Sequence, residues 1–239
     1  MHAVILAAGD GGRLYPLTHA TPKPLLKVAG RPLINHVLDA LFAGGVRDAT
    51  IVVGYHGDQI RAALENVRPR GMTIRFVENT AYEEGNARSL WEARDAGREP
   101  FLLAMGDHLV EPALVRSVLT RHNGASALAV DHAHPDDARA DEATRAHVDG
   151  GIVIDLGKGI EVWNALDTGL FWCTPEVIES MTSPVLRDGE LGAVFAALAR
   201  AGRLEAIDVT GMRWMDVDTP EDLQAAQAWA PQEWGAAPV

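Results

Sequence analysis

Three short, uninterrupted apolar runs in the first half of the chain constrain its fold most. They cover residues 3–8, 50–54 and 101–105, with the sequences AVILAA, TIVVG and FLLAM. Apolar runs of this length without polar alternation are typical of strands buried on both faces. Between the first two runs, residues 33–42 carry apolar side chains at helical spacing, with Pro32 before them. The alternation of strand and helix predicts an α/β, Rossmann-like fold with a mixed, mainly parallel sheet flanked by helices.

The rest of the chain continues this pattern and shows no repeat or linker. We expect further strands at residues 72–79, 151–157, 167–173 and 213–218. We expect further helices at residues 58–67, 85–97, 112–122, 176–181, 189–201 and 220–229. Residues 131–150 are polar and interrupted by proline, which predicts an exposed excursion outside the core. The chain is long enough for one large domain, which we place at residues 1–229, followed by a tail at 230–239.

The composition disfavours several classes of partner. The formal net charge is −12, and an acidic surface disfavours nonspecific binding to nucleic acid or to an anionic membrane. No apolar run approaches the roughly 20 residues that span a bilayer, so we expect no membrane insertion. Cys173 is the only cysteine, which excludes an intrachain disulfide and favours a cytoplasmic location. The sequence is compatible with a monomer or a homodimer.

A glycine-rich loop follows the first apolar run. Gly9, Gly11 and Gly12 allow a tight turn that brings backbone N–H groups to phosphate oxygens, and Arg13 can grip the same oxygens with two hydrogen bonds. Three prolines within residues 14–24 oppose the immediate helix of a dinucleotide-binding fingerprint, and the loop lacks the GK[ST] of a Walker motif. By itself the loop fits either a phosphate site or a simple turn.

The wider pattern distinguishes these two interpretations. Residues 6–33 match LAAGxGxRLxPLTxxxPKPLxxVxGxPL, which resembles the signature of nucleotidyltransferases that make nucleoside diphosphate sugars and related compounds. The resemblance implies a GT-A-like fold with a nucleotide-binding half at about 1–110 and an acceptor-binding half at about 111–229. It also implies a nucleotide site in which the base and ribose lie near Ala7, Ala8 and Gly9, the phosphates near Gly11, Gly12 and Arg13, and the triphosphate near Lys23. Pro22 and Pro24 stiffen the backbone that carries this lysine.

Three aspartates end apolar segments of the chain. Asp107 follows the run at 101–105, and Asp216 and Asp218 end the segment RWMDVD. If both strands lie in one sheet, their ends converge on the glycine loop, where carboxylates and phosphate oxygens together suit Mg²⁺. Each aspartate alone also fits a helix cap or a turn. The resemblance implies that Asp107 and Asp216 bind the metal, and Asp218 is either a second ligand or the start of a helix. His108 is expected to point the other way along the strand from Asp107, and to be either structural or a neighbour that supports the metal ligands.

The stretch FVENTAYEEGNARSLWEA resembles cytidylyltransferases that act on small phosphorylated alcohols. Asn86 and Ser89 in this stretch supply donor and acceptor groups that could read a pyrimidine edge. The stretches MGDH, DTGLF and WMDVDTPED together resemble CTP:inositol-1-phosphate cytidylyltransferases, and the similarity runs over residues 3–223. The resemblance therefore implies CTP and a small phosphorylated acceptor, inositol 1-phosphate, as the substrates.

The expected reaction is attack of the acceptor phosphate on the α-phosphorus of CTP, with release of pyrophosphate. A phosphate monoester has a second pKa of about 6, so it needs no protein base. We expect Arg13, Lys23, Asp107 and Mg²⁺ to carry catalysis by positioning and by neutralising charge. Lys158 is a candidate for binding the acceptor phosphate. Further candidates, for the acceptor hydroxyls, are Asp131, Asp167 and Thr168.

Several alternatives remain open at the level of sequence. Sugar-1-phosphate uridylyl-, thymidylyl- or guanylyltransferases share the glycine loop, and phosphocholine or phosphonate cytidylyltransferases share much of the remaining pattern. A choline acceptor would need an aromatic cage, for which Trp163 and Trp172 are candidates unless they belong to the core. A catalytically silent nucleotide-binding module would lose the phosphate and metal residues, and an NAD-dependent oxidoreductase would need a helix directly after the glycines.

Overall fold

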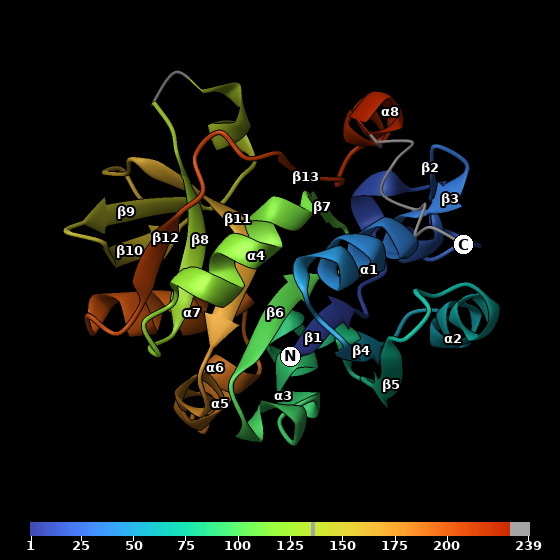
Figure 1. Ribbon diagram of the computed structural model, residues 1–239, viewed down its shortest axis with the longest axis horizontal. Helices are drawn as coiled ribbons and strands as arrows, with labels where there is room; N and C mark the ends of the chain where they lie inside the picture. The colour runs from blue at the N-terminus through green and yellow to red at the C-terminus, as the bar shows by residue number, and fades with distance from the viewer. Residues whose placement is uncertain (135–136, 230–239) are drawn as a thin grey trace.

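One mixed sheet organises the protein (Figure 1). The computed structural model describes residues 1–134 and 137–229. In this part of the chain, nine strands form the sheet in the order β5-β4-β1-β6-β11-β8-β12-β10-β9. In chain order, these strands are β1 (His2–Ala7), β4 (Asp48–Val53), β5 (Thr73–Glu78), β6 (Phe101–Met105), β8 (Ala127–His132), β9 (Arg145–Asp149), β10 (Ile152–Gly157), β11 (Ala165–Cys173) and β12 (Glu205–Asp208).

The two halves of the sheet differ in strand direction. In the first half, β1 pairs in parallel with β4 and β6, and β4 pairs in parallel with β5. In the second half, β11 runs antiparallel to β6, β8 and β9, whereas β12 and β8 pair in parallel. The sheet is mixed as expected, and its parallel pairing is concentrated in the half that carries the glycine loop.

Helices cover both faces of the sheet (Figure 1). Their bounds are α1 (Leu33–Gly44), α2 (Gly57–Asn66), α3 (Asn86–Glu92), α4 (Pro112–Arg121), α5 (Pro175–Ser180), α6 (Pro184–Arg187), α7 (Leu191–Arg200) and α8 (Pro220–Trp229). Alternate residues of β1 enter two separate apolar clusters: Ile5 packs with α1, α2 and α4, whereas Val4 packs with α3, α5 and α7. Both faces of β1 are therefore covered, which explains its uninterrupted apolar sequence.

Two expectations about strands are wrong. Residues 131–150 are not wholly an exposed excursion, because β9 lies within them, pairs with β10 and β11, and buries Ala146 completely. Asp216 does not end a strand of the main sheet. It lies in β13 (Trp214–Asp216), which forms a separate antiparallel pair with β7 (His108–Val110). A third, two-stranded sheet joins β2 (Lys27–Val28) to β3 (Arg31–Pro32).

The expected tail at 230–239 lies outside the described residues. Among the helices of the described ranges, none is long and apolar enough to cross a membrane.

Candidate active site

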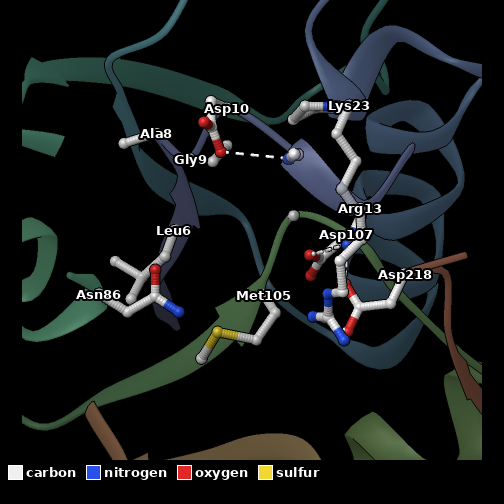
Figure 2. A pocket seen from close by; sticks show the side chains of 15 residues that line it. Leu6, Ala8, Gly9, Asp10, Arg13, Lys23, Asn86, Met105, Asp107 and Asp218 are labelled. Carbon is white, nitrogen blue, oxygen red and sulfur yellow. Dashed lines mark hydrogen bonds and ion pairs between the residues drawn. The ribbon is translucent and has the colours of Figure 1, made fainter. Parts of the chain in front are cut away.

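A cavity of about 440 Å³ opens at the carboxyl ends of β1 and β6, where open α/β sheets place their ligands. Most of the predicted nucleotide-binding residues line it, namely Ala7, Ala8, Gly9, Gly11, Gly12, Arg13, Lys23 and Asn86. Asn86 lies at one end with Leu6, and Arg13, Lys23, Asp107 and Asp218 gather at the other (Figure 2). Most of the charged groups that line the cavity therefore lie at one end of it.

The glycine loop has a conformation that side chains would disturb. Gly11 has a φ of 67°, and a Cβ atom there would lie 2.9 Å from Cβ of Lys23. The Gly11 carbonyl accepts a hydrogen bond from Oγ1 of Thr18, and the Gly12 amide donates to Asp10. After the loop, residues 12–14 form a single 3-10 turn instead of an α-helix. This geometry differs from the dinucleotide-binding fingerprint, as expected from the prolines.

Lys23 is the most constrained cation of the site. It lies in a short 3-10 turn between Pro22 and Pro24, and its side chain is only 8% exposed. Its Nζ lies 2.6 Å from Oδ2 of Asp107 and 3.9 Å from Oδ1 of Asp216, and it also pairs with Asp218. Burial alone would lower the pKa of Lys23, but the three carboxylates outweigh burial and raise it above its usual range. The lysine is therefore held protonated at the centre of the aspartates.

Asp107, His108 and Asp216 form a second, overlapping cluster. The pairing of β13 with β7 places Asp216 opposite His108, and Nδ1 of His108 lies 3.0 Å from Oδ1 of Asp107 and 3.7 Å from Oδ1 of Asp216. The expectation that His108 points away from Asp107 is therefore wrong. Each of the three residues offers a ligand atom, and these atoms lie within 4.8 Å of one another.

The protonation of this cluster reflects burial and mutual charge. Burial would raise the pKa of Asp107, but Lys23 and His108 outweigh it and hold that pKa well below its usual range. Burial raises the pKa of Asp216 to about 7; His108 opposes this shift, and Asp107 adds to it. Burial would lower the pKa of His108, but Asp216 and Asp107 raise it to about 9.

The donor set fits a divalent cation. Oδ1 of Asp216 is buried and has no hydrogen-bond partner within residues 1–134 and 137–229. An unpartnered carboxylate oxygen beside two further aspartates is the oxygen-rich environment that Mg²⁺ prefers. Burial is the main cause of the raised pKa of Asp216, and a bound cation would offset the repulsion from Asp107 that adds to it.

The sequence left open whether Asp218 caps a helix, and in the structure its carboxylate does not cap α8. The amide of Asp222 donates to Oγ1 of Thr219, and the Thr219 amide donates to Oδ2 of Asp222. This reciprocal pair caps α8. The Asp218 carboxylate instead pairs with Lys23 and with Arg13 of the glycine loop. Asp218 therefore belongs to the charged end of the cavity.

The two candidates for reading the base are placed differently. Asn86, the first residue of α3, lines the cavity. Ser89 is only 3% exposed, lies outside the described lining of the cavity, and accepts a hydrogen bond from Nδ2 of Asn79 at 3.0 Å. Although Ser89 is only three residues from Asn86 on the helix, it is buried and its hydroxyl is occupied by Asn79. Direct contact of Ser89 with a base is therefore not supported by its position.

A second cavity of about 270 Å³ adjoins the first and shares Arg13, Asn86, Asp107 and Asp218 with it. Two of the four predicted acceptor residues, Lys158 and Asp167, line this second cavity. Burial raises the pKa of Asp167 to about 6, although the Gly169 amide and His108 oppose the shift. Gly169 is required beside it, because a Cβ atom there would lie 2.3 Å from the His108 ring.

The other two acceptor candidates face elsewhere. Thr168 is fully buried, and its hydroxyl donates to the carbonyl of Ala129, because successive residues of a strand point to opposite faces. Asp131 is 5% exposed and is bonded to Arg139 and Trp214. Neither residue belongs to the described lining of the second cavity.

The aromatic cage considered for a choline acceptor does not assemble in the described part of the chain. Trp172 is 4% exposed and stacks on His122. The guanidinium of Arg145 lies over the ring of Trp163. Neither tryptophan lines the second cavity as described, whereas Trp214 does. The residues Glu142, Ala143 and Thr144 also line it and were missed, since they lie in the segment expected to be an exposed excursion.

Comparison with known proteins agrees with this geometry. A family model described as nucleotidyl transferase matches residues 2–233, and the chain belongs to this family. It is 37% identical over 233 residues to a bifunctional IPC transferase and DIPP synthase of Rubrobacter xylanophilus, a match that covers 94% of this chain and 51% of that relative. It is 31% identical over 239 residues to the UTP–glucose-1-phosphate uridylyltransferase AglF of Haloferax volcanii, which covers 95% of each chain.

The structural comparison leads to the same family. The inositol-1-phosphate CTP transferase from T. maritima superposes with a TM-score of 0.84 and 26% identity, covering 95% of this chain and 93% of that chain. The chain spans about half the length of the bifunctional relative.

Proposed function

We propose that this protein transfers the cytidylyl group of CTP to inositol 1-phosphate and releases pyrophosphate. The observation that carries the proposal is the junction of two cavities across one set of aspartates, with the glycine loop on one side and Lys158 and Asp167 on the other. Two phosphorylated substrates held in adjoining cavities can react without a covalent enzyme intermediate. The names of the bifunctional relative and of the T. maritima structure support the choice of substrates.

The chemistry requires positioning and charge neutralisation. An oxygen of the acceptor phosphate forms a bond to the α-phosphorus of CTP, and the bond from that phosphorus to the bridging β-phosphate oxygen breaks. With a second pKa of about 6, the acceptor phosphate is largely dianionic at neutral pH and needs no base. Arg13 and the glycine loop bind the triphosphate, Lys158 binds the acceptor phosphate, and Asp167 orients an acceptor hydroxyl.

Asp107 and Asp216 would hold Mg²⁺, which supplies positive charge next to the reacting phosphate oxygens. The Lys23 ammonium pairs with the same two aspartates in the free protein, and it would be available to the triphosphate when these carboxylates hold a cation.

A sugar-1-phosphate uridylyltransferase is the second candidate, because the match to the uridylyltransferase AglF covers nearly the full length of both chains. The two candidates share the triphosphate site and differ in base and acceptor. Asn86 at the uncharged end of the first cavity is the residue placed to contribute to base choice.

The test is pyrophosphate release by the purified protein with Mg²⁺, each of the four NTPs, and a panel of acceptors. The panel contains inositol 1-phosphate, glucose 1-phosphate, phosphocholine and aminoethylphosphonate. Release with CTP and inositol 1-phosphate supports the proposal. Release with UTP and glucose 1-phosphate supports the second candidate, and no release with any pair contradicts both.

A further inference from the structure

We propose that Asp131, Arg139 and Trp214 act as positioning residues. They hold residues 142–144, one wall of the second cavity, against β13, the strand that carries Asp216. We call the second cavity the acceptor cavity, after the proposed function. The inference deepens the proposed function, on which it rests, by assigning acceptor positioning to three side chains outside the reacting groups. We call these three residues the clamp.

Asp131 is the centre of the clamp. It lies near the end of β8 and is 5% exposed. Its Oδ2 accepts a hydrogen bond from Nη1 of Arg139 at 2.7 Å and another from Nε1 of Trp214 at 2.9 Å. The Arg139 guanidinium also lies over the Trp214 ring, 5.4 Å from its centroid. Asp131 and Arg139, which are eight residues apart, therefore meet the distant Trp214 through mutual contacts of charged and aromatic groups.

Arg139 connects the clamp to the cavity wall. Its carbonyl accepts a hydrogen bond from the Ala143 amide, and its guanidinium also pairs with Asp137 at 2.7 Å. At the other end of this turn, the Thr144 carbonyl accepts a hydrogen bond from the Asp167 amide of β11. Residues 142–144, which line the acceptor cavity, are thus held between the clamp and the strand that carries Asp167.

Trp214 connects the clamp to the metal side. It is the first residue of β13, and Asp216 is the last. Residues two apart on a strand point to the same side, and both Trp214 and Asp216 line the second cavity. The bond from Nε1 of Trp214 to Asp131 therefore anchors the first residue of the strand whose last residue is Asp216. The clamp sets the separation between the acceptor wall and this carboxylate.

The same contacts explain how the Asp131 side chain is accommodated in a buried position. A buried carboxylate is costly unless it is paired and hydrogen-bonded, and here both donors belong to the segments that form the cavity. If Asp131 bound the acceptor directly, it would line the second cavity. Instead, its donors Arg139 and Trp214 belong to the two segments that supply lining residues.

The test uses Arg139→Met, which removes the guanidinium from a half-exposed side chain, and Trp214→Phe, which keeps an aromatic ring and removes Nε1–H. Arg200→Met is the matched control, because Arg200 makes a similar pair with Asp155 outside both cavities. KM is measured separately for nucleotide and acceptor. We expect each clamp variant to raise the acceptor KM about tenfold, the size of one lost charged contact, with the nucleotide KM and the control unchanged.

A second readout does not depend on turnover. Loss of the clamp should speed amide hydrogen exchange in residues 139–144 and also in residues 214–216, because Arg139 and Trp214 contact each other and share one oxygen of Asp131. If exchange becomes faster in one of the two segments but not in the other, and this holds for both variants, then the two segments are not coupled. That result would overturn the inference.

The outcomes separate the inference from the proposed function. If the wild type turns over a nucleotide and acceptor pair but the clamp variants keep its acceptor KM, the inference fails and the function stands. Equal rises in both KM values also contradict it, since a general loss of folding would cause them. If the wild type turns over no pair, the proposed function fails, and coupled hydrogen exchange still tests whether the clamp joins the two segments.

Discussion

The side of this protein that we propose to bind the nucleotide and the side that we propose to bind the acceptor are built in different ways. We call them the nucleotide side and the acceptor side. On the nucleotide side, the glycine loop and Lys23 lie within a single stretch at residues 6–33 and line a cavity at the ends of parallel strands. On the acceptor side, Lys158 follows β10, Asp167 lies in β11, and Trp214 belongs to β13, outside the main sheet. A site made from one continuous stretch shows in the sequence as a motif, whereas a site made from several strands does not.

The largest expected effect comes from Asp107, which borders both cavities. We expect Asp107→Asn to lower kcat/KM about 10³-fold, or about 4 kcal/mol, because it removes a proposed metal carboxylate at the reacting phosphates. The control is Asp95→Asn, which changes an exposed aspartate paired with Arg98. Pyrophosphate release measures the effect, and circular dichroism reports the fold. Activity within about tenfold of wild type would remove Asp107 from the mechanism.

Lys23→Met tests whether the lysine and a cation share one position. Removing the ammonium leaves three carboxylates without their central charge, so thermal stability should fall in EDTA and recover with Mg²⁺. Mn²⁺ binding without nucleotide should be tighter than in the wild type, and turnover should fall about 10²-fold. Equal Mn²⁺ affinity in the two proteins would contradict a shared position.

Gly11→Ala probes the nucleotide side alone. The substitution places a Cβ atom at positive φ and 2.9 Å from Lys23, so we expect the nucleotide KM to rise about tenfold and the acceptor KM to stay unchanged. Gly124→Ala is the matched control, since Gly124 also has positive φ but a Cβ atom there would have no described neighbour within 4 Å. Both variants should lose about 1 kcal/mol of unfolding free energy, and only Gly11→Ala should affect the nucleotide.

Lys158→Met probes the acceptor side alone. It removes an exposed cation of the second cavity, so the acceptor KM should rise about fivefold to tenfold while the nucleotide KM is unchanged. Lys27→Met, which changes an exposed lysine of β2, serves as control. A rise in the nucleotide KM instead would mean that the two sides are not separable.

The smallest effect separates Ser89 from Asn86. Ser89→Ala removes the partner of Asn79 and should cost about 1 kcal/mol of unfolding free energy in chemical denaturation, with the preference between CTP and UTP retained. Asn86→Ala should reduce that preference, because Asn86 lines the cavity. A change of base preference in Ser89→Ala would restore the sequence-based assignment.

The nucleotide side could be predicted in detail for a physical reason. Its backbone turns are local, so Gly11 and the prolines around Lys23 report the conformation directly. Of the four acceptor candidates, Lys158 and Asp167 line the second cavity and stay predictions, whereas Asp131 and Thr168 lie outside its described lining. In a strand, a shift of one residue reverses the face of a side chain, and sequence alone does not decide which face meets the cavity.

By itself, the sequence determined the α/β class, the position of the glycine loop and the three aspartates that end apolar segments. Buried runs, glycine turns and strand ends leave local signals. Only the tertiary structure decided that Asp216 reaches Asp107 through the separate pair of β7 and β13. It also decided that Asp218 pairs with Lys23 while Thr219 and Asp222 cap α8. These outcomes depend on contacts between side chains many residues apart, and chain folding brings such groups together without any pattern in the local sequence.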